Sequence, residues 1–548
     1  MKVVIVGGVA AGATLATALR RKGPDIDIVM FEKDRDFSFS NCSIPYSLSG
    51  IIENTKDLIN RTKDDFKYKN NIDARNHQLV EKINRKEKSV EVKDLITQKT
   101  YKESYDYLVL ATGASSIELD FEGSKQNNVF TLRNVEDLEK IKNYVNINNS
   151  KKVLAIGGGF ISIEAIENMV ESGMDATIVS HGDEVLSQID TELKGVIHNN
   201  LKKHNVKLIF DNSVEKIEGK KVTFTNSTIE EFDVILMTVG MLPNSKLAKD
   251  CGLKLTERGF IDVDRNFKTS DDSIFAAGDA VSVYNTVSRK KQNLMLAWPA
   301  HRQAKQIADT IVGNSHLYEG VIGTFQLRSF DINIASTGLS ENELIKNSFE
   351  YDTAIIRAND RVSHMPNSKE IYIKLLFDKF TGELYGAQAV GEGDVDKRID
   401  VCASVIRYKG NVYDIERLEL GYSPVYSTTE DALNTAGAMA SEILDRNIKQ
   451  LKMREVDEKI KNFDLIDIRN KEEFEKLSFK NSKNLKLSDI RNYINKEKNT
   501  LIVDERGYSA SNLLKSLSKE GFDNVYMLQG GFDLFKNFAE IKKLDLFN

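Results

Sequence analysis

The sequence predicts a protein of the α/β class with several domains, and three observations support this prediction. The chain has 548 residues, which is too long for one hydrophobic core and corresponds to roughly three or four domains. Two glycine-rich turns, at residues 7–12 and 157–162, each follow a short apolar strand pattern and precede an apolar helix pattern. Hydrophobic residues make up 41% of the chain and charged residues 29%, as in ordinary globular proteins.

The first glycine-rich turn lies in the stretch VVIVGGVAAGATLATALRR. It follows the logic of a GxGxxG turn, in which glycines allow a tight bend, close approach of backbone to a pyrophosphate, and a helix N-terminus aimed at the phosphates. The strand IDIVMF follows and ends about where an acid that binds a ribose is expected. The predicted dinucleotide-binding residues of this unit are Gly7, Gly8, Ala11, Gly12, Glu32 and Lys33.

The second glycine-rich turn, in KVLAIGGGFISIEAIENMVESGMDATIVS, repeats the unit with Ser162 in the place of the third glycine. Its second strand ends at a serine and a histidine, so no acid is there to repel a 2′-phosphate, and we expect NADPH to be accepted while NADH remains usable. Two units about 150 residues apart indicate two different dinucleotides. The predicted binding residues are Gly157, Gly158, Gly159, Phe160, Ile161, Ser180, His181 and Gly240.

Two further apolar strands complete this part of the chain. DYLVLATGAS ends in Ala111, Thr112 and Gly113, and SIFAAGDAVSV carries Gly278 and Asp279 at its end. Together with the paired glycine-rich units, these segments resemble the two-dinucleotide flavoprotein disulfide reductase superfamily over about the first 325 residues. The resemblance implies two Rossmann-like domains, the first for FAD and the second for NAD(P)H, with Asp279 near the ribityl-phosphate region of the flavin.

The segment SFSNCSIPYSLSG contains Cys42 and resembles the SFxNCGLPYYxG segment of the single-cysteine branch of this superfamily. That branch includes coenzyme A-disulfide reductases, NAD(P)H oxidases and peroxidases, and persulfide reductases. Dithiol members have a CxxxxC pair, but position 47 here is serine. The resemblance implies that Cys42 is the redox centre, and we expect the flavin and nearby donors to stabilise its thiolate. The other implied site residues are Asn41 for catalysis and Ser38, Arg20, Arg21 and Arg61 for substrate binding.

A single thiol leaves the identity of the electron acceptor open. If the substrate supplies a second sulfur, from coenzyme A disulfide or a related small disulfide or persulfide, Cys42 forms a mixed disulfide. If oxygen or peroxide is the acceptor, Cys42 cycles through sulfenic acid. A third hypothesis is a redox-responsive flavoprotein whose C-terminal region only binds a partner.

Residues 326–445 contain KRIDVCASVIRY and LGYSPVYSTTEDALNTAG, which resemble the α+β dimerisation domain of the coenzyme A members of the branch. The resemblance implies a homodimer in which Tyr422, with Tyr426 behind it, reaches the cysteine of the partner subunit, where a phenol can donate a proton. The alternative is two tyrosines that pack in a proline turn. Asn367, in SHMPNSKEIYI, stands where those members carry another tyrosine, and an amide cannot deliver a phenolic proton.

The C-terminal residues resemble an α/β rhodanese domain through FDLIDIRNKEEFEK, TLIVDERGYSASNLLKSL and GFDNVYMLQGGFDLFKN. In rhodaneses the strand equivalent to TLIV leads into a loop that holds a persulfide-forming cysteine. Here Asp504 follows the strand, the loop is expected to be short, and no cysteine follows Cys402. We therefore exclude a cysteine persulfide in this domain. We also expect the charged stretch SEILDRNIKQLKMREVDEKIKN to be a linker, so that a chain ending near residue 447 keeps its dimer, flavin and activity.

The predicted domains are an FAD-binding domain at 1–149 and 266–325, an NAD(P)H-binding domain at 150–265, a dimerisation domain at 326–447 and a rhodanese-like domain at 460–548. Three cysteines in such a long chain favour a reducing compartment, so we expect a cytoplasmic location. The net charge of −6 gives no reason to expect nucleic acid. No apolar run approaches the roughly 20 residues of a membrane span, and no metal site is predicted.

Overall fold

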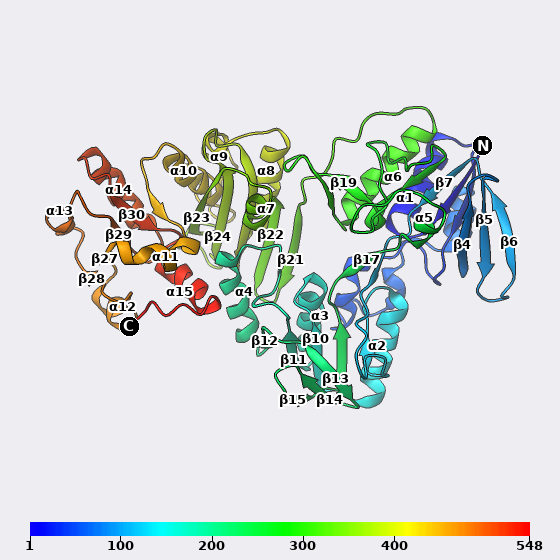
Figure 1. Ribbon diagram of the computed structural model, residues 1–548, viewed down its shortest axis with the longest axis horizontal. Coiled ribbons are helices and arrows are strands. Elements are labelled where there is room, and N and C mark those ends of the chain that lie inside the picture. Colours follow the sequence, from blue (N-terminus) through cyan, green and yellow to red (C-terminus); the bar gives the residue numbers. More distant parts are fainter. The chain divides into compact units, whose positions relative to one another are not determined.

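The computed structural model describes all residues 1–548 and divides them into two compact units (Figure 1). The first unit contains residues 1–181 and 211–321, and the second contains residues 182–210 and 322–548. The chain therefore leaves the first unit just after the predicted Ser180–His181 position and returns at residue 211. None of the helices combines the length and apolar composition that crossing a membrane requires.

A five-stranded parallel sheet in the order β18–β7–β1–β2–β3 forms the core of the first unit. Val4 at its centre pairs with Val29 on one side and Leu108 on the other, and is fully buried. Such β-branched residues suit a strand that is covered on both faces. Helices α1 and α6 pack against each other. The bounds are β1 Lys2–Val6, α1 Ala10–Lys22, β2 Asp27–Phe31, β3 Asp73–Arg75, β7 Tyr107–Leu110, β18 Ile274–Ala276 and α6 Ala297–Ile311.

The second glycine-rich turn builds a parallel sheet in which β11, β10, β16 and β9 are neighbours in that order. Its bounds are β9 Val129–Phe130, β10 Lys152–Ile156, β11 Asp175–Val179 and β16 Val234–Met237, with α2 Val135–Asn148 and α3 Phe160–Glu171. Smaller antiparallel sheets complete the unit, together with the short helix α5 Lys246–Asp250. Their strands are β4 Gln78–Asn84, β5 Ser89–Asp94, β6 Thr100–Ser104, β8 Ala114–Ser116, β13 Val214–Glu218, β14 Lys221–Phe224, β15 Ile229–Glu231, β17 Met241–Pro243, β19 Ser282–Tyr284 and β20 Lys291–Asn293.

An antiparallel sheet in the order β21–β22–β25–β24–β23 forms the centre of the second unit, and helices α8 and α10 pack on it. Helix α4, from the stretch 182–210, contacts β25 and β21 of the same sheet. The bounds are α4 Thr191–Lys203, β12 Lys207–Ile209, β21 Phe325–Ser329, β22 Ile332–Gly338, α7 Glu341–Lys346, β23 Tyr351–Asn359, β24 Glu370–Asp378, β25 Leu384–Gly391, α8 Asp396–Arg407, α9 Val412–Arg417 and α10 Ala432–Leu444.

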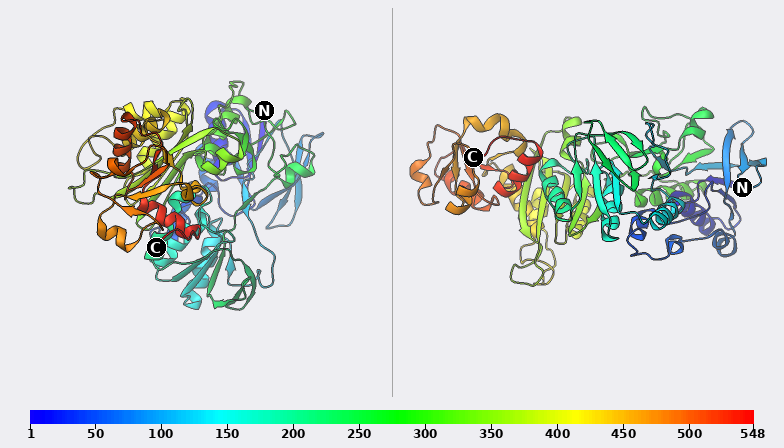
Figure 2. Two further views of the ribbon diagram at one scale, coloured as in Figure 1. Left: turned by 60° about the vertical axis from the view of Figure 1, so that its left-hand side comes forward. Right: turned by 90° about the horizontal axis from the view of Figure 1, so that it is seen from below.

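The C-terminal domain lies beside this antiparallel sheet in the second unit, as the orange and red elements of Figures 1 and 2 show. Its own sheet is parallel, in the order β26–β30–β29–β27–β28. The bounds are β26 Gln450–Leu451, α11 Val456–Lys459, β27 Asp464–Asp467, α12 Lys471–Lys476, β28 Lys483–Asn484, α13 Ile490–Tyr493, β29 Thr500–Val503, α14 Tyr508–Lys519, β30 Val525–Leu528 and α15 Phe532–Ile541.

The expectation of a linker between residues 441 and 462 is wrong. Its first residues form the end of α10, residues 450 and 451 form strand β26, and short helical turns follow up to residue 462. Met453 and Val456 are fully buried. The apolar residues, spaced among the charges, anchor this stretch in the fold, so it is part of the second unit and not a spacer.

A buried ion pair joins the two sequence motifs that resemble a dimerisation domain. Arg398 in α8 donates from Nε and Nη2 to the carboxylate of Asp431 at 2.8 Å, and Nη2 also donates to the backbone oxygen of Asp360. Arg398 is 1% exposed. Asp431 in turn caps α10 by accepting from the backbone N–H of Leu433. The pair therefore fixes the start of α10 and the end of the loop that carries Tyr422 and Tyr426.

Arg398→Met should destabilise the protein, because it leaves the buried Asp431 carboxylate without its charge partner. Removing one member of a buried pair typically costs about 3–5 kcal/mol. We expect a lower Tm by calorimetry, and we expect the double variant Arg398→Met/Asp431→Asn to recover part of the loss. Equal Tm values for the wild type and the single variant would contradict this role.

Candidate functional site

The first glycine-rich turn is built to receive a phosphate. A Cβ at Gly7 would collide with the backbone oxygen of Ala111, and one at Gly12 would collide with that of Gly7, so only glycine permits this packing. Helix α1 starts directly after the turn, with no side-chain cap and no acid in its first turn. Its free N–H groups therefore suit the pyrophosphate of a dinucleotide.

Glu32 lies where the sequence predicts a ribose-binding acid, at the end of β2. Its carboxylate accepts from the backbone N–H of Gly8 at 2.8 Å and from that of Asp34 at 3.1 Å. Burial raises the pKa of Glu32, and these two N–H groups oppose the rise. The hydrogen bonds orient the carboxylate beside the glycine turn. These features fit an FAD adenosine and pyrophosphate held by Gly7, Gly8, Gly12 and Glu32.

Arg133 joins the predicted Asp279 to the strand that ends in Ala-Thr-Gly. Its Nη2 lies 3.3 Å from the Asp279 carboxylate, and its Nε donates to the backbone oxygen of Ala114. Burial raises the pKa of Asp279, and Arg133 opposes the rise. Gly278, with a φ of 81°, donates its N–H to the buried Gln303. Sequence analysis missed Arg133, because no local motif connects it with a strand 140 residues away.

The loop after β7 is fixed by Asn244, which sequence analysis also did not single out. The side chain of Asn244 donates to the backbone oxygen of Thr112, and its backbone N–H donates to that of Gly113. The hydroxyl of Thr112 donates to the backbone oxygen of Asn244 at 2.6 Å. Nearby, the backbone oxygen of Gly240 accepts from the N–H of Ile117. These bonds hold the predicted residues 111–113 and 240 in one loop cluster.

The second glycine-rich turn has the same design as the first. Gly157 has a φ of 106°, and a Cβ there would lie 2.7 Å from the backbone oxygen of Thr238. Gly159 caps α3 without a side-chain bond and faces open space. At the end of β11, His181 is exposed and lies with Nδ1 3.2 Å from the hydroxyl of Ser213, while Ser180 accepts at its backbone oxygen from Asn212.

Cys42 lies on a short exposed turn, η1 Asn41–Ser43, which a second turn, η2 Pro45–Ser47, follows. The segment is anchored on the first glycine turn, because the backbone N–H of Ser38 donates to the oxygen of Gly8 at 3.0 Å. It is also tied to α3, where Asn168 accepts from the hydroxyl of Ser49 at 2.6 Å. Both dinucleotide units of the sequence thus hold the cysteine segment.

Two buried polar atoms beside Cys42 have no partner among the protein groups. They are the side-chain oxygen of Asn41 and the hydroxyl of Ser47, which is fully buried. Ser47 occupies the position where a dithiol relative carries its second cysteine, so the hydroxyl stands in that place without a redox function. Unpaired buried polar atoms are uncommon in folded proteins and often mark functional sites.

Among the protein groups around Cys42, burial outweighs the one cationic donor that favours its thiolate. Burial by surrounding atoms raises the pKa of the Cys42 thiol, although its sulfur-bearing side chain reaches solvent, and Glu164 adds to the rise. Arg133 opposes it. Burial raises the pKa of Glu164 itself to about 7, with a contribution from Glu167. Glu164 lies one helical turn beyond Phe160, so helical spacing could have placed it near the site.

The other two cysteines do not belong to this site. Cys251 is half-buried and its thiol donates to the backbone oxygen of Ala248. Cys402 is fully buried in α8, and burial raises its pKa to about 12. All three thiols are free. Cys402 and Cys251 therefore have structural positions.

The predicted substrate-binding arginines differ in their surroundings. Arg20 donates to the backbone oxygens of Pro24, Asn70 and Asn71, so its guanidinium is largely used to hold that loop. Arg61 donates to the side chain of Asn70 at 2.9 Å and lies over the ring of Phe66. Arg21 is exposed at the end of α1.

Helix α1 also contacts His301 of α6. Its Thr14 hydroxyl lies 2.5 Å from Nδ1 of His301, and burial lowers the pKa of His301.

In the second unit, Tyr422 and Tyr426 lie in an exposed loop, with 47% and 66% of their surfaces accessible. Arg361 connects this loop with the segment that carries Asn367, because its Nη1 donates to the backbone oxygen of Val425 at 2.9 Å. Asn367 has a φ of 65°, a left-handed conformation that asparagine tolerates better than most residues. The structure therefore places the tyrosine loop and the Asn367 loop side by side.

Comparison with known proteins identifies the three parts of the chain. Residues 1–304 match the pyridine nucleotide-disulphide oxidoreductase family, and residues 326–432 match the dimerisation domain of that family. Residues 452–538 match the rhodanese-like domain. The chain belongs to the pyridine nucleotide-disulphide oxidoreductase family. The predicted fold class and resemblance are confirmed, and the dimerisation domain indicates a homodimer.

Relatives of this oxidoreductase share its architecture over most of their length. The coenzyme A disulfide reductase of Staphylococcus epidermidis is 34% identical over 440 residues, which cover 80% of this chain and 99% of the relative. The reduced Bacillus anthracis protein CoADR-RHD is 36% identical, covers 98% of both chains and superposes with a TM-score of 0.96. An NAD-dependent persulfide reductase from A. fulgidus is 30% identical, covers 97% of this chain and 100% of that one, and has a TM-score of 0.90.

This oxidoreductase fold binds FAD and NAD(P)H, in agreement with the two glycine-rich units. The protein is therefore an FAD-dependent pyridine nucleotide-disulfide oxidoreductase.

Glu164→Gln should make Cys42 more reactive near neutral pH. The substitution removes the negative charge that raises the pKa of the thiol, so the thiolate forms at lower pH. Alkylation of the Cys42 peptide, followed by mass spectrometry across a pH series, should show a midpoint at lower pH and a several-fold higher rate at about pH 7. Glu171→Gln, which removes an exposed acid from the end of the same helix, is the matched control. Identical midpoints in both variants would rule out this influence of Glu164.

Proposed function

We propose that this protein reduces coenzyme A disulfide, or a related small disulfide or persulfide, with electrons from NAD(P)H and with Cys42 as its only redox thiol. The observation that carries the proposal is the isolation of an exposed Cys42 on a turn anchored to the first glycine unit. Position 47 holds serine, and Cys402 is fully buried elsewhere. The second sulfur of a reducible S–S bond must then come from the substrate.

The exchange step uses groups of this chain. The thiolate of Cys42 attacks one sulfur of the substrate disulfide, and an S–S bond forms between Cys42 and that sulfur. The substrate S–S bond breaks, and the other sulfur leaves as a thiolate that takes up a proton. Glu164, with a pKa of about 7, is a suitable proton source in the neighbourhood of Cys42. FAD, when bound, supplies the two electrons that release the second substrate thiol from Cys42.

The remaining candidate residues support this assignment in different ways. Gly7, Gly8, Gly12, Glu32 and Asp279 would hold FAD through the contacts described above. Tyr422 and Tyr426 are exposed on the dimerisation domain, which suits contact with the partner subunit. Asn367, in place of a second phenol, can bind substrate through its amide but cannot deliver a phenolic proton. Relatives named coenzyme A disulfide reductase and persulfide reductase make these two substrate classes the first to examine.

Cys42→Ser should retain FAD but lose reduction of sulfur acceptors by at least about a hundredfold, because no other thiol lies in the motif. The purified variant should keep its flavin absorbance. Turnover should be measured with coenzyme A disulfide, coenzyme A persulfide and oxygen, and oxygen reduction by the flavin should survive. Unchanged turnover with both coenzyme A acceptors would contradict the proposal. Peroxide or oxygen turnover that depends on Cys42 would instead favour an oxidase or peroxidase.

Ser180→Glu should lower kcat/KM selectively with NADPH, by about tenfold. A carboxylate at the end of β11 would repel the 2′-phosphate and would accept hydrogen bonds from the ribose diol of NADH. Steady-state kinetics with both nucleotides measure the effect, and Ser213→Ala, which changes only the partner of His181, is the comparison. An equal loss with NADH and NADPH would show that Ser180 does not read the 2′ position.

A further inference from the structure

The C-terminal rhodanese-like domain packs against the dimerisation sheet through buried contacts. Gln529 is 1% exposed and donates to the hydroxyl of Thr353 in β23 at 2.7 Å, and Gln450 donates to the backbone oxygen of the same residue. Arg357 of β23 bonds to Asp533 at the start of α15, and Arg506 bonds to Glu370 of β24. This domain is therefore an integral part of the second unit.

The same domain also packs against α4. This helix follows Ser180 and His181, which are predicted to bind NADPH. Helix α15 contacts α4 along its length. A Cβ at Gly195 in α4 would collide with Asn537 in α15, so only glycine allows the two helices to approach this closely. At the edges, Lys202 bonds to Glu540 and Lys542 bonds to Asp183, both at 2.8 Å. Because these partners lie far apart in sequence, the contact was not predictable from motifs.

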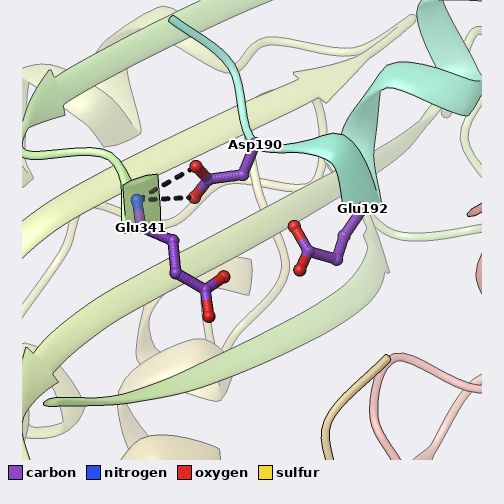
Figure 3. A group of neighbouring side chains, drawn as sticks. All are labelled: Asp190, Glu192 and Glu341. Atoms are coloured by element: carbon purple, nitrogen blue, oxygen red, sulfur yellow. Dashed lines mark hydrogen bonds between the residues drawn. The ribbon is translucent and has the colours of Figure 1, made fainter. Parts of the chain in front are cut away.

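Three buried carboxylates lie where α4, the dimerisation sheet and the C-terminal domain meet. Asp190 immediately precedes α4, Glu192 lies in its first turn, and Glu341 begins α7, as Figure 3 shows. Their oxygen atoms lie within 4.8 Å of one another. The ammonium of Lys374 in β24 is 3.0, 2.8 and 2.6 Å from the three carboxylates, respectively. A lysine therefore fills the position that a metal ion would need.

Arg454 of the C-terminal domain provides the second positive charge of this cluster. Its Nε lies 2.9 Å from Glu192 and 3.3 Å from Glu341, and its Nη2 lies 3.9 Å from Asp190. Three carboxylates and two cations leave one excess negative charge. Burial raises the pKa of Asp190 to about 6, with Lys374 opposing. Although Glu192 is equally buried, Lys374 and Arg454 hold its pKa at about 2. Without Arg454 the buried excess would be two charges.

The loop that holds a cysteine in rhodaneses is occupied here by a carboxylate of the chain. Asp504, the first residue after β29, accepts from the backbone N–H groups of Gly507, Ser509 and Ala510 at 2.8, 2.9 and 3.2 Å. These are the amides at the start of α14. The anion-binding end of that helix is thus occupied by Asp504, and the domain has no thiol there.

We propose that the C-terminal domain is a brace that holds α4 against the dimerisation sheet, with Arg454 as the positioning residue. The brace contacts the start of the excursion 182–210 at Asp183 and both ends of α4, and thereby fixes the chain that leaves Ser180 and His181 and the seating of NAD(P)H. This proposal rests on the family assignment and not on the identity of the disulfide. It differs from the expectation that a chain ending near residue 447 keeps its dimer, flavin and activity, because that chain would lose Arg454 and the contacts of the C-terminal domain with β23.

The test compares Arg454→Met with Lys459→Met in the full-length, FAD-loaded protein. Lys459 is an exposed cation of the same segment, paired with Glu455, and should change nothing. In Arg454→Met, hydrogen–deuterium exchange of the α4 peptide should be about tenfold faster. The Kd of NADPH and NADH, from anaerobic bleaching of the flavin, should rise about three- to tenfold. This readout needs no disulfide acceptor, so failure of the proposed substrate class would not affect it.

The pH dependence of stability separates a charge effect from lost packing. A carboxyl group whose pKa is raised on folding stabilises the protein at low pH and loses this contribution as pH rises through the raised pKa. In the wild type, the stability that Asp190 contributes is lost between about pH 4 and pH 6. Arg454 opposes the rise in the pKa of Asp190, so in Arg454→Met this pKa should lie above about 6. The loss of stability then extends to higher pH in the variant, and the difference in Tm between wild type and variant should grow as pH rises above about 6.

Gly195→Ala provides a second route that leaves Arg454 in place, because the new Cβ separates α15 from α4. It should also speed exchange in α4 and weaken NAD(P)H binding. Unchanged α4 exchange and unchanged Kd values in both variants would overturn the brace, even if both lowered the Tm. A Tm difference that is independent of pH would overturn the role of the Arg454 charge.

Discussion

The position of the reactive thiol depends on the backbone of Gly8. Its N–H donates to the carboxylate of Glu32, and its oxygen accepts from the N–H of Ser38, four residues before Cys42. A side chain at this position would strike the ring of Phe37. One residue therefore links the predicted adenosine end of the flavin site with the segment that carries the thiol. This anchoring, together with the bond from Ser49 to Asn168 in α3, fixes the segment that presents the cysteine.

Sequence reasoning succeeded where the signal is local. Glycine-rich turns after β-branched strands, and an acid at the end of the next strand, follow from the backbone geometry of adjacent residues, and the structure contains them as predicted. The rhodanese-like fold was also recognisable, because its strands and helices retain their apolar patterns. The dimerisation motifs KRIDV and TTED are two separate segments of the sequence. The ion pair between Arg398 and Asp431 explains in physical terms why they occur together.

Sequence reasoning failed where the partner of a residue lies far away in the chain. Arg133 reaches Asp279 across 146 residues, and no local motif suggests this contact. Glu164 raises the pKa of Cys42 from another part of the chain, and only its helical spacing from Phe160 points to the site. The segment around Arg454 has the charge content of a solvated linker, whereas the structure places its half-buried arginine against three buried carboxylates. The number of charged residues does not distinguish a solvent-exposed face from a buried cluster of ion pairs, because both contain the same residue types.

The backbone amide groups at a helix N-terminus can be satisfied in two ways, and this chain contains both, at α14 through Asp504 and at α1. At α1 the amide groups are left for a ligand that arrives by diffusion, so their occupancy depends on its concentration. At α14 the anion is covalently attached, and its effective concentration exceeds that of any dissolved competitor. In the C-terminal domain these amide groups already bind a carboxylate of the chain, so they are not free for a dissolved anion or for a sulfane sulfur. The domain keeps the rhodanese-like architecture, while a side chain of its own occupies the place of the ligand.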